Sequence, residues 1–158
     1  MHPSVARVVA VARQHGYELD IHEFPAGTRT AHDAARAVGV AVGQIVKSLV
    51  FMANGQPLVV LVAGCHRADT RKVATLINAT AVGRADAEQA RQATGYAIGG
   101  IPPFGHARNV PILIDRTLLS YDTVWSAAGT PYHVFPLAPE DLVRCTGGMV
   151  GDVAEDTA

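Results

Sequence analysis

Two almost uninterrupted apolar segments, Ile45–Ala53 and Pro57–Gly64, dominate the hydrophobic pattern of the chain. Consecutive apolar positions are typical of a strand that is buried on both faces. The dipeptide Asn54-Gly55 joins the two segments, and it favours a two-residue hairpin turn because both positions of that turn need positive φ. The pattern therefore predicts a central hairpin that is covered on both sides.

Lys47 interrupts the apolar pattern of the first strand. A buried ammonium group costs several kcal/mol unless it is paired, bound to a ligand or neutralised. The chain otherwise carries its positive charges on arginine, since Lys47 and Lys72 are the only lysines among 13 basic residues. Two interpretations follow: a lysine whose stem lies on apolar surface while its amine reaches water, or a lysine that holds a substrate.

Helical periodicity and capping residues predict five short helices. Apolar residues at Val5, Val8, Val9 and Ala12 share one face of a helix over Pro3–His15. Thr30 suits the N-cap of the second helix, and a glycine follows the predicted end of each of the others except the third. These further helices are predicted over Ala31–Val38, Asp69–Asn78, Asp86–Thr94 and residues 139–146.

Shorter strands are predicted between the helices, over Glu18–Phe24, Ala79–Gly83, Val110–Ile114, Val124–Gly129 and Tyr132–Leu137. Hairpin and crossover connections both occur in this order, which indicates a single compact domain of the α/β or α+β class with a mixed sheet. We expect the domain to span residues 1–148. Residues 149–158 are small and acidic, and are expected to form a frayed, flexible tail.

The composition excludes several classes of protein. A chain of 158 residues with 49% hydrophobic content suits one domain. Its net charge of −1 argues against strong non-specific binding to nucleic acid, although a local basic patch remains possible, and no DNA partner is expected. The spacing of the cysteines and histidines suggests no disulfide, zinc site or other metal site. No signal peptide is recognised, and no apolar run approaches the roughly 20 residues of a membrane-spanning helix. We expect a cytoplasmic protein without cofactor or metal.

The segment Gly99–His106 is the most irregular part of the chain, because it contains three glycines and two prolines. Such a segment continues neither a helix nor a central strand. It is either an ordinary surface turn or a rigid loop whose backbone N–H groups cradle a carbonyl, an oxyanion or a sugar phosphate. It matches neither a Walker loop nor a dinucleotide-binding fingerprint.

No protein nucleophile is evident from the sequence. Ser48 points to the opposite face of its strand from Lys47, so a Ser–Lys pair between these neighbours has poor geometry. His106 and His133 adjoin glycine- and proline-rich loops and are expected to be solvated, and Asp115 is expected to cap the short turn that follows it. The residues alone predict a mixed α/β domain with an unusual lysine and a rigid loop.

The order and spacing of several short motifs resemble the YbaK/EbsC family, which is related to the editing domain inserted in bacterial prolyl-tRNA synthetases. The resemblance extends from about Val5 to Thr146. The motifs that carry it are Thr28-Arg29-Thr30-Ala31, residues 44–51, Thr94-Gly95-Tyr96, residues 99–105, Val124-Trp125 and Ala128-Gly129-Thr130-Pro131.

The resemblance implies a compact α/β domain with a mixed, barrel-like sheet surrounded by short helices. It also implies a trans-editing enzyme that hydrolyses the ester of a mischarged aminoacyl-tRNA, often a tRNA for proline. The 3′ end of aminoacyl-tRNA would be the partner, together with an aminoacyl-tRNA synthetase. Water would be the nucleophile. The alternatives are a non-catalytic module that binds a tRNA end or a synthetase, and a hydrolase of a small free ester.

The resemblance also assigns the candidate site residues. Lys47 matches the key lysine of the family, and the glycine-rich loop matches the segment that contacts the terminal adenosine or the aminoacyl carbonyl. Better-known members carry Ser-Pro where this chain has Pro102-Pro103, so the amino acid that is edited does not carry over. The expected catalytic residues are Lys47, Gly99 and Gly100, and the expected substrate-binding residues are Arg29, Thr30, Phe104, Gly105, Thr130 and His133.

Overall fold

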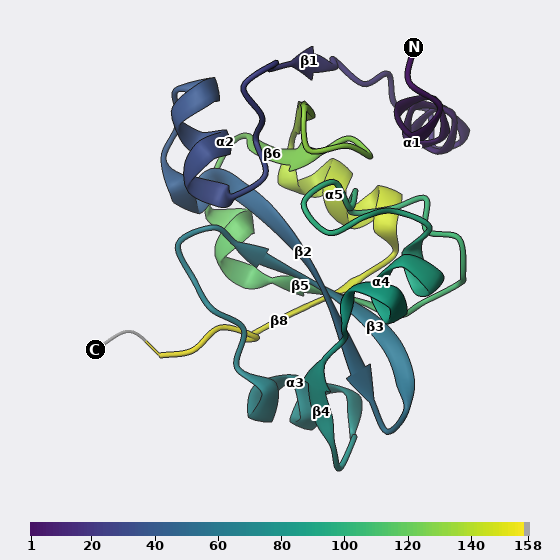
Figure 1. Ribbon diagram of the computed structural model, residues 1–158. Coiled ribbons are helices and arrows are strands. Elements are labelled where there is room, and N and C mark those ends of the chain that lie inside the picture. The colour runs from purple at the N-terminus through teal and green to yellow at the C-terminus, as the bar shows by residue number, and fades with distance from the viewer. Residues whose placement is uncertain (157–158) are drawn as a thin grey trace.

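The computed structural model describes residues 1–156 and contains one eight-stranded mixed sheet (Figure 1). Its strand order is β1-β7-β6-β2-β3-β5-β8, and β4 pairs with β2 outside this order. The strands are β1 (His22–Glu23), β2 (Ile45–Ala53), β3 (Gln56–Ala63), β4 (Val82–Arg84), β5 (Ile112–Asp115), β6 (Val124–Ala127), β7 (His133–Leu137) and β8 (Met149–Gly151).

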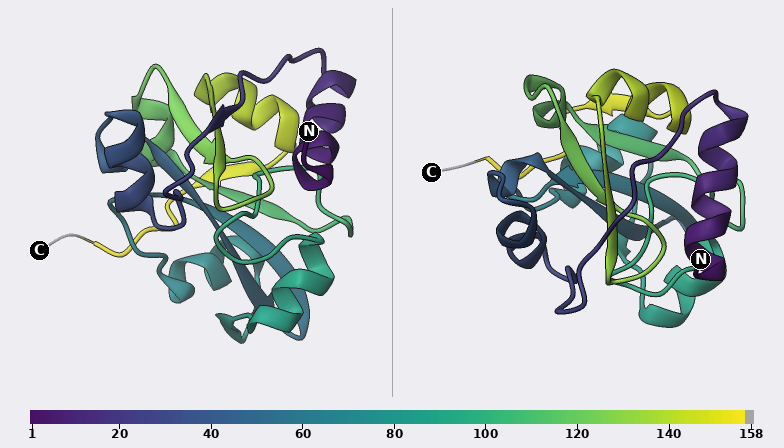
Figure 2. Two further views of the ribbon diagram at one scale, coloured as in Figure 1. Left: turned by 45° about the horizontal axis from the view of Figure 1, so that its top comes forward. Right: turned by 90° about the horizontal axis from the view of Figure 1, so that it is seen from above.

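Short helices surround the sheet. The views in Figures 1 and 2 place α1 and α2 on opposite sides of the molecule, and Figure 1 places α3 beside β4 at the end that carries the β2–β3 turn. The α-helices are α1 (Pro3–Gln14), α2 (Ala31–Val38), α3 (Thr70–Ile77), α4 (Ala87–Thr94) and α5 (Pro139–Thr146). Two 3₁₀ helices, η1 (Val42–Gln44) and η2 (Arg116–Ser120), complete the elements.

The predicted central hairpin is confirmed. Strands β2 and β3 pair antiparallel up to Ala53 and Gln56, and Asn54 and Gly55 turn the chain with φ of 49° and 81°. Every residue of Val59–Ala63 is 0% exposed. Alternate residues of β3 enter two separate hydrophobic clusters, so both faces of the hairpin are covered and its burial stabilises the whole sheet.

The sheet has a gap beside the middle of β2. Strand β6 pairs only with Ile45 and Val46, and β4 pairs only from Phe51 onward. Among residues 1–156, no second strand pairs with Lys47, Ser48 and Leu49, which have β3 on one side only. The amide of Gly64 donates to the carbonyl of Ile45, so the backbone groups of Ile45 face β3. In an antiparallel pair, successive residues direct their backbone groups alternately toward and away from the partner strand. The N–H and C=O groups of Ser48, three residues after Ile45, therefore point away from β3 and into the gap.

The fold class agrees with the prediction of a single mixed α/β domain. The first strand is shorter than expected, because only His22 and Glu23 pair with β7 and the rest of Glu18–Phe24 is irregular. No helix within residues 1–156 combines the length and the apolar character needed to cross a membrane.

The expectation of a frayed tail is wrong for residues 149–156. Strand β8 pairs in parallel with β5, Ala154 bridges to Ala68, and Val153 is 0% exposed. Two acidic residues of this segment form ion pairs with Lys72, whose Nζ lies 3.0 Å from an oxygen of Asp152 and 2.7 Å from one of Asp156. Burial and ion pairing therefore hold the segment on the sheet. Residues 157 and 158 lie outside the described part of the chain.

Candidate functional site

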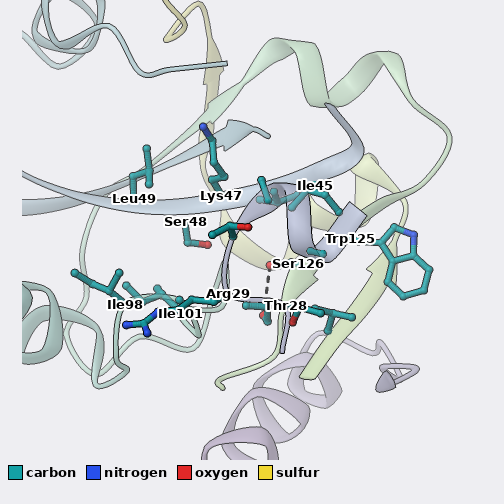
Figure 3. Close-up of a pocket in the computed structure, with 17 residues that line it drawn as sticks. Thr28, Arg29, Ile45, Lys47, Ser48, Leu49, Ile98, Ile101, Trp125 and Ser126 are labelled. Carbon is teal, nitrogen blue, oxygen red and sulfur yellow. Dashed lines mark hydrogen bonds between the residues drawn. The ribbon is translucent and has the colours of Figure 1, made fainter. Parts of the chain in front are cut away.

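A cavity of about 400 Å³ opens beside the gap in β2 (Figure 3). Its walls come from the start of α2, the middle of β2, the loop around Gly99 and strand β6. The lining is mostly apolar and contains no histidine, aspartate or glutamate from residues 1–156. The lining residues are Thr28, Arg29, Thr30, Ala31, Ala34, Ile45, Val46, Lys47, Ser48, Leu49, Ile98, Gly99, Ile101, Trp125, Ser126, Ala127 and Val134.

Ser48 presents a polar group to this apolar cavity. Its Oγ is buried and has no hydrogen-bond partner among the described residues. Figure 3 shows the side chain directed toward Arg29 and Ile101. A buried hydroxyl without a partner costs about 1–3 kcal/mol, and it can both donate to and accept from a ligand. The Ser48 hydroxyl and the backbone N–H and C=O groups of Ser48, which have no partner strand among residues 1–156, therefore both face the cavity.

Lys47 borders the cavity with its backbone and stem, but its amine leaves β2 on the opposite face, as Figure 3 shows. The Nζ donates a hydrogen bond to the backbone carbonyl of His66. Burial lowers the pKa of the half-buried Lys47 ammonium, and Arg84 and Arg67 lower it further, against the opposing effects of Cys65 and Asp115. No carboxylate among residues 1–156 pairs with this lysine.

A buried acid holds the residue that anchors Lys47. Asp115 is 1% exposed, and its Oδ2 lies 3.1 Å from Nδ1 of His66 and accepts from the amide of Ala63 at 3.1 Å. Its Oδ1 accepts from the amide of Thr117, so the predicted cap of the following turn is confirmed. The same carboxylate thus fixes the turn, β3 and the histidine whose carbonyl receives Lys47.

Arg29 and Thr30 enter the cavity wall at the start of α2. The Oγ1 of Thr30 accepts from the amide of Asp33 at 3.0 Å, which confirms its predicted role as N-cap and leaves its O–H free to donate. Arg29 lies across Gly99, where an added Cβ would come within 2.8 Å of the arginine Cγ. The structure therefore brings Arg29, Thr30 and Gly99 together with the stem of Lys47.

The two glycines of the loop have different environments. Gly99 has a φ of +96° and lines the cavity, and its amide has no hydrogen-bond partner recorded within residues 1–156. The amide of Gly100 donates to the carbonyl of Ala97 at 3.0 Å, so it is already used within the loop. Gly100 packs on the backbone of Thr130, where a Cβ would lie 2.7 Å from Cα. Of these two amides, that of Gly99 is therefore the one without a hydrogen-bond partner in the described part of the chain.

Phe104 and Gly105 stand apart from the cavity lining. The Phe104 ring is 2% exposed and packs against Phe135 with ring centroids 5.9 Å apart. The Gly105 carbonyl accepts from the hydroxyl of Tyr96 at 3.3 Å. His106 is not solvated as expected: its Nε2 lies 2.8 Å from the carbonyl of Pro102, and burial lowers its pKa. These residues hold the shape of the loop.

Thr130 and His133 form a pair behind the loop rather than in the cavity wall. The Thr130 Oγ1 lies 2.6 Å from Nδ1 of His133 and accepts from the amide of Tyr132 at 3.1 Å. The other ring nitrogen of His133 lies 3.4 Å from a carboxylate oxygen of Glu23. Because Gly100 packs against the Thr130 backbone, the Thr130–His133 pair stabilises the position of the loop.

Five residues of the cavity are not among the candidates expected from the sequence, namely Thr28, Ser48, Ile98, Trp125 and Ser126. Ser48 carried a visible signal, because it is a small polar residue in an otherwise apolar strand. The others belong to apolar patterns or common loop compositions, and only the fold brings them to one place. Within residues 1–156, no three side chains of His, Cys, Asp or Glu lie close enough to hold a metal ion.

Other solved proteins share this fold. A solved structure of a proposed trans-editing enzyme for prolyl tRNA synthetase matches with a TM-score of 0.92 and 43% identity, covering 99% of each chain. This similarity defines the class as the YbaK-type editing domains. Residues 25–145 match the model of the aminoacyl-tRNA editing domain, and the chain belongs to that family. The resemblance seen in the motifs is therefore confirmed.

Relatives occur both as separate proteins and within larger enzymes. The uncharacterized protein YwhH of Bacillus subtilis is 32% identical over 141 residues, 88% of this chain and 89% of that protein. EbsC of Enterococcus faecalis, a proposed Cys-tRNA(Pro)/Cys-tRNA(Cys) deacylase, is 26% identical over 125 residues, 78% of this chain and 76% of EbsC. A Geobacillus proline–tRNA ligase is 30% identical over 115 residues, 72% of this chain but 20% of the ligase.

Proposed function

We propose that this protein is a trans-editing deacylase that hydrolyses the ester between a mischarged amino acid and the 3′-terminal ribose of a tRNA. The first candidate is a tRNA for proline, with a prolyl-tRNA synthetase as the partner that supplies the mischarged substrate. The observation that carries the proposal is the cavity beside the open stretch of β2, in a chain of the editing family.

The cavity suits the aminoacyl end of such a substrate. Apolar residues such as Ile45 and Ile98 can surround a small side chain, while the Ser48 hydroxyl and the Gly99 amide offer hydrogen bonds to the ester. Each donor that meets the developing oxyanion contributes roughly 10²–10³ in rate. Thr130 lies behind the loop, so in this arrangement its role is to position Gly100 and not to touch the amino acid.

Water is the nucleophile in this proposal. Ser48 has no histidine or carboxylate beside it in the cavity lining, and a serine without an adjacent base is a weak nucleophile. An aminoacyl ester is already labile, so orientation and oxyanion donors can supply much of the acceleration. The ribose hydroxyl of the substrate can orient the water.

The direction of the Lys47 side chain favours a role as phosphate anchor over a role as oxyanion donor. Its amine lies on the face of β2 opposite Ser48, away from the space where the ester would sit. A carbonyl holds the amine, and a neutral partner leaves the positive charge available to a phosphate. In this arrangement the terminal nucleotide lies in the gap beside β2, with its phosphate at Lys47 and its ester in the cavity.

An apolar cavity discriminates only weakly among small amino acids, because one methylene changes the relative rate by only roughly 10–200-fold. The substrate panel should therefore contain alanine, cysteine and serine on the same tRNA, with correctly charged prolyl-tRNA as the reference.

Single-turnover deacylation of this panel tests the proposed function. We expect the wild-type protein to hydrolyse at least one mischarged tRNA, and Lys47→Ala to lower its kcat/KM by about 10²-fold, as expected for the loss of a charged group that orients the substrate. Lys47→Arg should recover part of this loss, since it keeps the charge without the compact geometry of an ammonium.

Lys72→Ala is the matched control, because it removes the other lysine at a site that pairs with Asp152 and Asp156. Full activity of Lys47→Ala would show that the proposed role of this lysine is wrong. Binding of tRNA without hydrolysis would instead support a non-catalytic module. Hydrolysis of free amino-acid esters but of no tRNA would support a small-ester hydrolase.

A further inference from the structure

A second hollow of about 700 Å³ lies on the face of β2 to which Lys47 points. It shares Lys47 and Leu49 with the cavity, so both spaces border the stretch of β2 that has no second neighbour. Its remaining lining comes mainly from the segment before α3, the start of α3 and the end of β4. We call it the basic groove, because Arg67, Arg71, Arg84 and Lys47 line it.

The basic groove concentrates positive charge in a chain whose net charge is −1. Two carboxylates also line it, but both are engaged. Asp69 caps α3 by accepting from the amides of Arg71 and Lys72 at 2.9 and 3.3 Å, and Glu155 lies 3.9 Å from Arg67. Four cationic groups against two engaged carboxylates leave an excess of positive charge.

The arginine side chains are available to a ligand. Arg67 is 86% exposed along its side chain, and Arg84 lies over the Phe51 ring at 5.5 Å. Within residues 1–156, Arg71 and Arg84 form no ion pair with an acid. Like charges that gather without partners repel one another, and a bound polyanion relieves that repulsion while releasing its own counterions.

We infer that the basic groove binds the ribose–phosphate backbone of the single-stranded 3′ end of tRNA, immediately upstream of the nucleotide that carries the amino acid. The inference rests on the proposed function, since it takes the aminoacyl ester to occupy the cavity. The terminal phosphate then lies at Lys47, which lines both spaces, and the preceding phosphates follow the arginines.

Contacts of this kind position a nucleic acid without reading its sequence. Among the groove residues only Phe51 is aromatic, and Arg84 already covers it, so no platform for stacking several bases is evident in the described groove. The groove should therefore hold the 3′ end of any tRNA, and the cavity alone should select the amino acid.

The test compares two double variants that remove the same charge. Arg71→Gln/Arg84→Gln alters the groove, and Arg13→Gln/Arg108→Gln removes two exposed arginines that lie outside the groove lining. Each protein is assayed on a mischarged tRNA and on the same amino acid esterified to adenosine, which carries no phosphate. Salt dependence is measured from low to physiological ionic strength.

We expect the groove variant to raise KM for the tRNA by about tenfold, with kcat and the adenosine ester unchanged, because only phosphate contacts are lost. The slope of log(kcat/KM) against log salt should fall by about one for each arginine removed. The control variant should match the wild type. Equal KM values and salt slopes for both variants would overturn the inference while leaving the deacylase activity intact.

Failure of the proposed function gives a different result. If the wild-type protein deacylates nothing in the panel, binding of an uncharged acceptor-stem minihelix with a free 3′ end is measured by fluorescence anisotropy. Weaker binding by the groove variant alone would keep the inference. Equal binding by both variants would overturn it. So would competition in which inorganic phosphate displaces the labelled minihelix as well as unlabelled minihelix does at the same concentration of phosphate groups.

Discussion

Lys47 is anchored by a neutral group, and this sets it apart from an ordinary buried lysine. A carboxylate partner would compensate its charge, whereas the His66 carbonyl accepts one hydrogen bond and leaves the charge for a substrate phosphate. Asp115 fixes the histidine across a sequence separation of 49 residues. The lysine was visible in the sequence as a break in an apolar strand, but its support was invisible because it depends on a contact between distant segments.

A substitution of Ser48 tests a single residue, because its hydroxyl should lower the free energy of unfolding and raise the rate of deacylation. Ser48→Ala removes a buried polar atom without a partner, so the free energy of unfolding should rise by about 1 kcal/mol. The same change should lower deacylation by about 10²-fold if the hydroxyl meets the developing oxyanion. Chemical denaturation and single-turnover assays measure the two effects.

Ser120→Ala is the control for Ser48→Ala. The Ser120 hydroxyl donates to the carbonyl of Thr117 at 2.6 Å and lies outside the cavity lining. Its loss should leave deacylation unchanged and should not stabilise the protein. Unchanged deacylation by Ser48→Ala would remove Ser48 from the proposed mechanism.

The loop that contains Gly99 and Gly100 depends on close packing between elements. A Cβ on Gly100 would lie 2.7 Å from the Thr130 Cα, and backbone atoms cannot move aside as a flexible side chain can. Gly100→Ala should therefore displace the loop and with it the Gly99 amide. We expect a fall of about 10²-fold in kcat, the scale expected for a displacement of about 1 Å at a reacting group.

Gly83→Ala provides the comparison for Gly100→Ala. A Cβ at Gly83 meets no atom within 4 Å, and this glycine pairs in β4 without a positive φ. It should keep both activity and thermal stability. Wild-type kcat in Gly100→Ala would mean that the loop tolerates the displacement and that the Gly99 amide is not a precise donor.

At the scale of elements, local patterns predicted most helices and strands well. The hairpin, α2 with its Thr30 cap and the helix after Asp86 follow from residues that lie next to one another in the sequence. The roles of Phe104 and His133 did not follow, because their partners lie on other elements. A motif shows that a loop matters, but not which of its residues face the ligand and which face the core.

The C-terminal segment shows the limit of composition as a guide at the scale of the whole molecule. Small and acidic residues suggested disorder, yet Val153 fills a core position and the acids pair with Lys72. Whether such a segment is ordered depends on what the rest of the fold leaves uncovered. Here it is the outer edge of β5 that β8 covers.

Val153→Ala tests whether this segment contributes to global stability. The side chain is 0% exposed, so the substitution should lower the free energy of unfolding by about 1–3 kcal/mol in chemical denaturation. Val150→Ala is the matched control, because Val150 lies on β8 itself but is 36% exposed. Equal effects of the two substitutions would argue against a core role for Val153.

The unpaired stretch of β2 has a consequence for solubility. Free backbone groups on a strand normally invite another chain to pair with them, which leads to aggregation. In this sheet the open groups lie between β6 and β4 on the same strand, so the opening spans only Lys47, Ser48 and Leu49. That length is too short to accept a strand from a neighbouring molecule. This stretch of β2 thus offers backbone groups to a small ligand but not to a strand of another molecule.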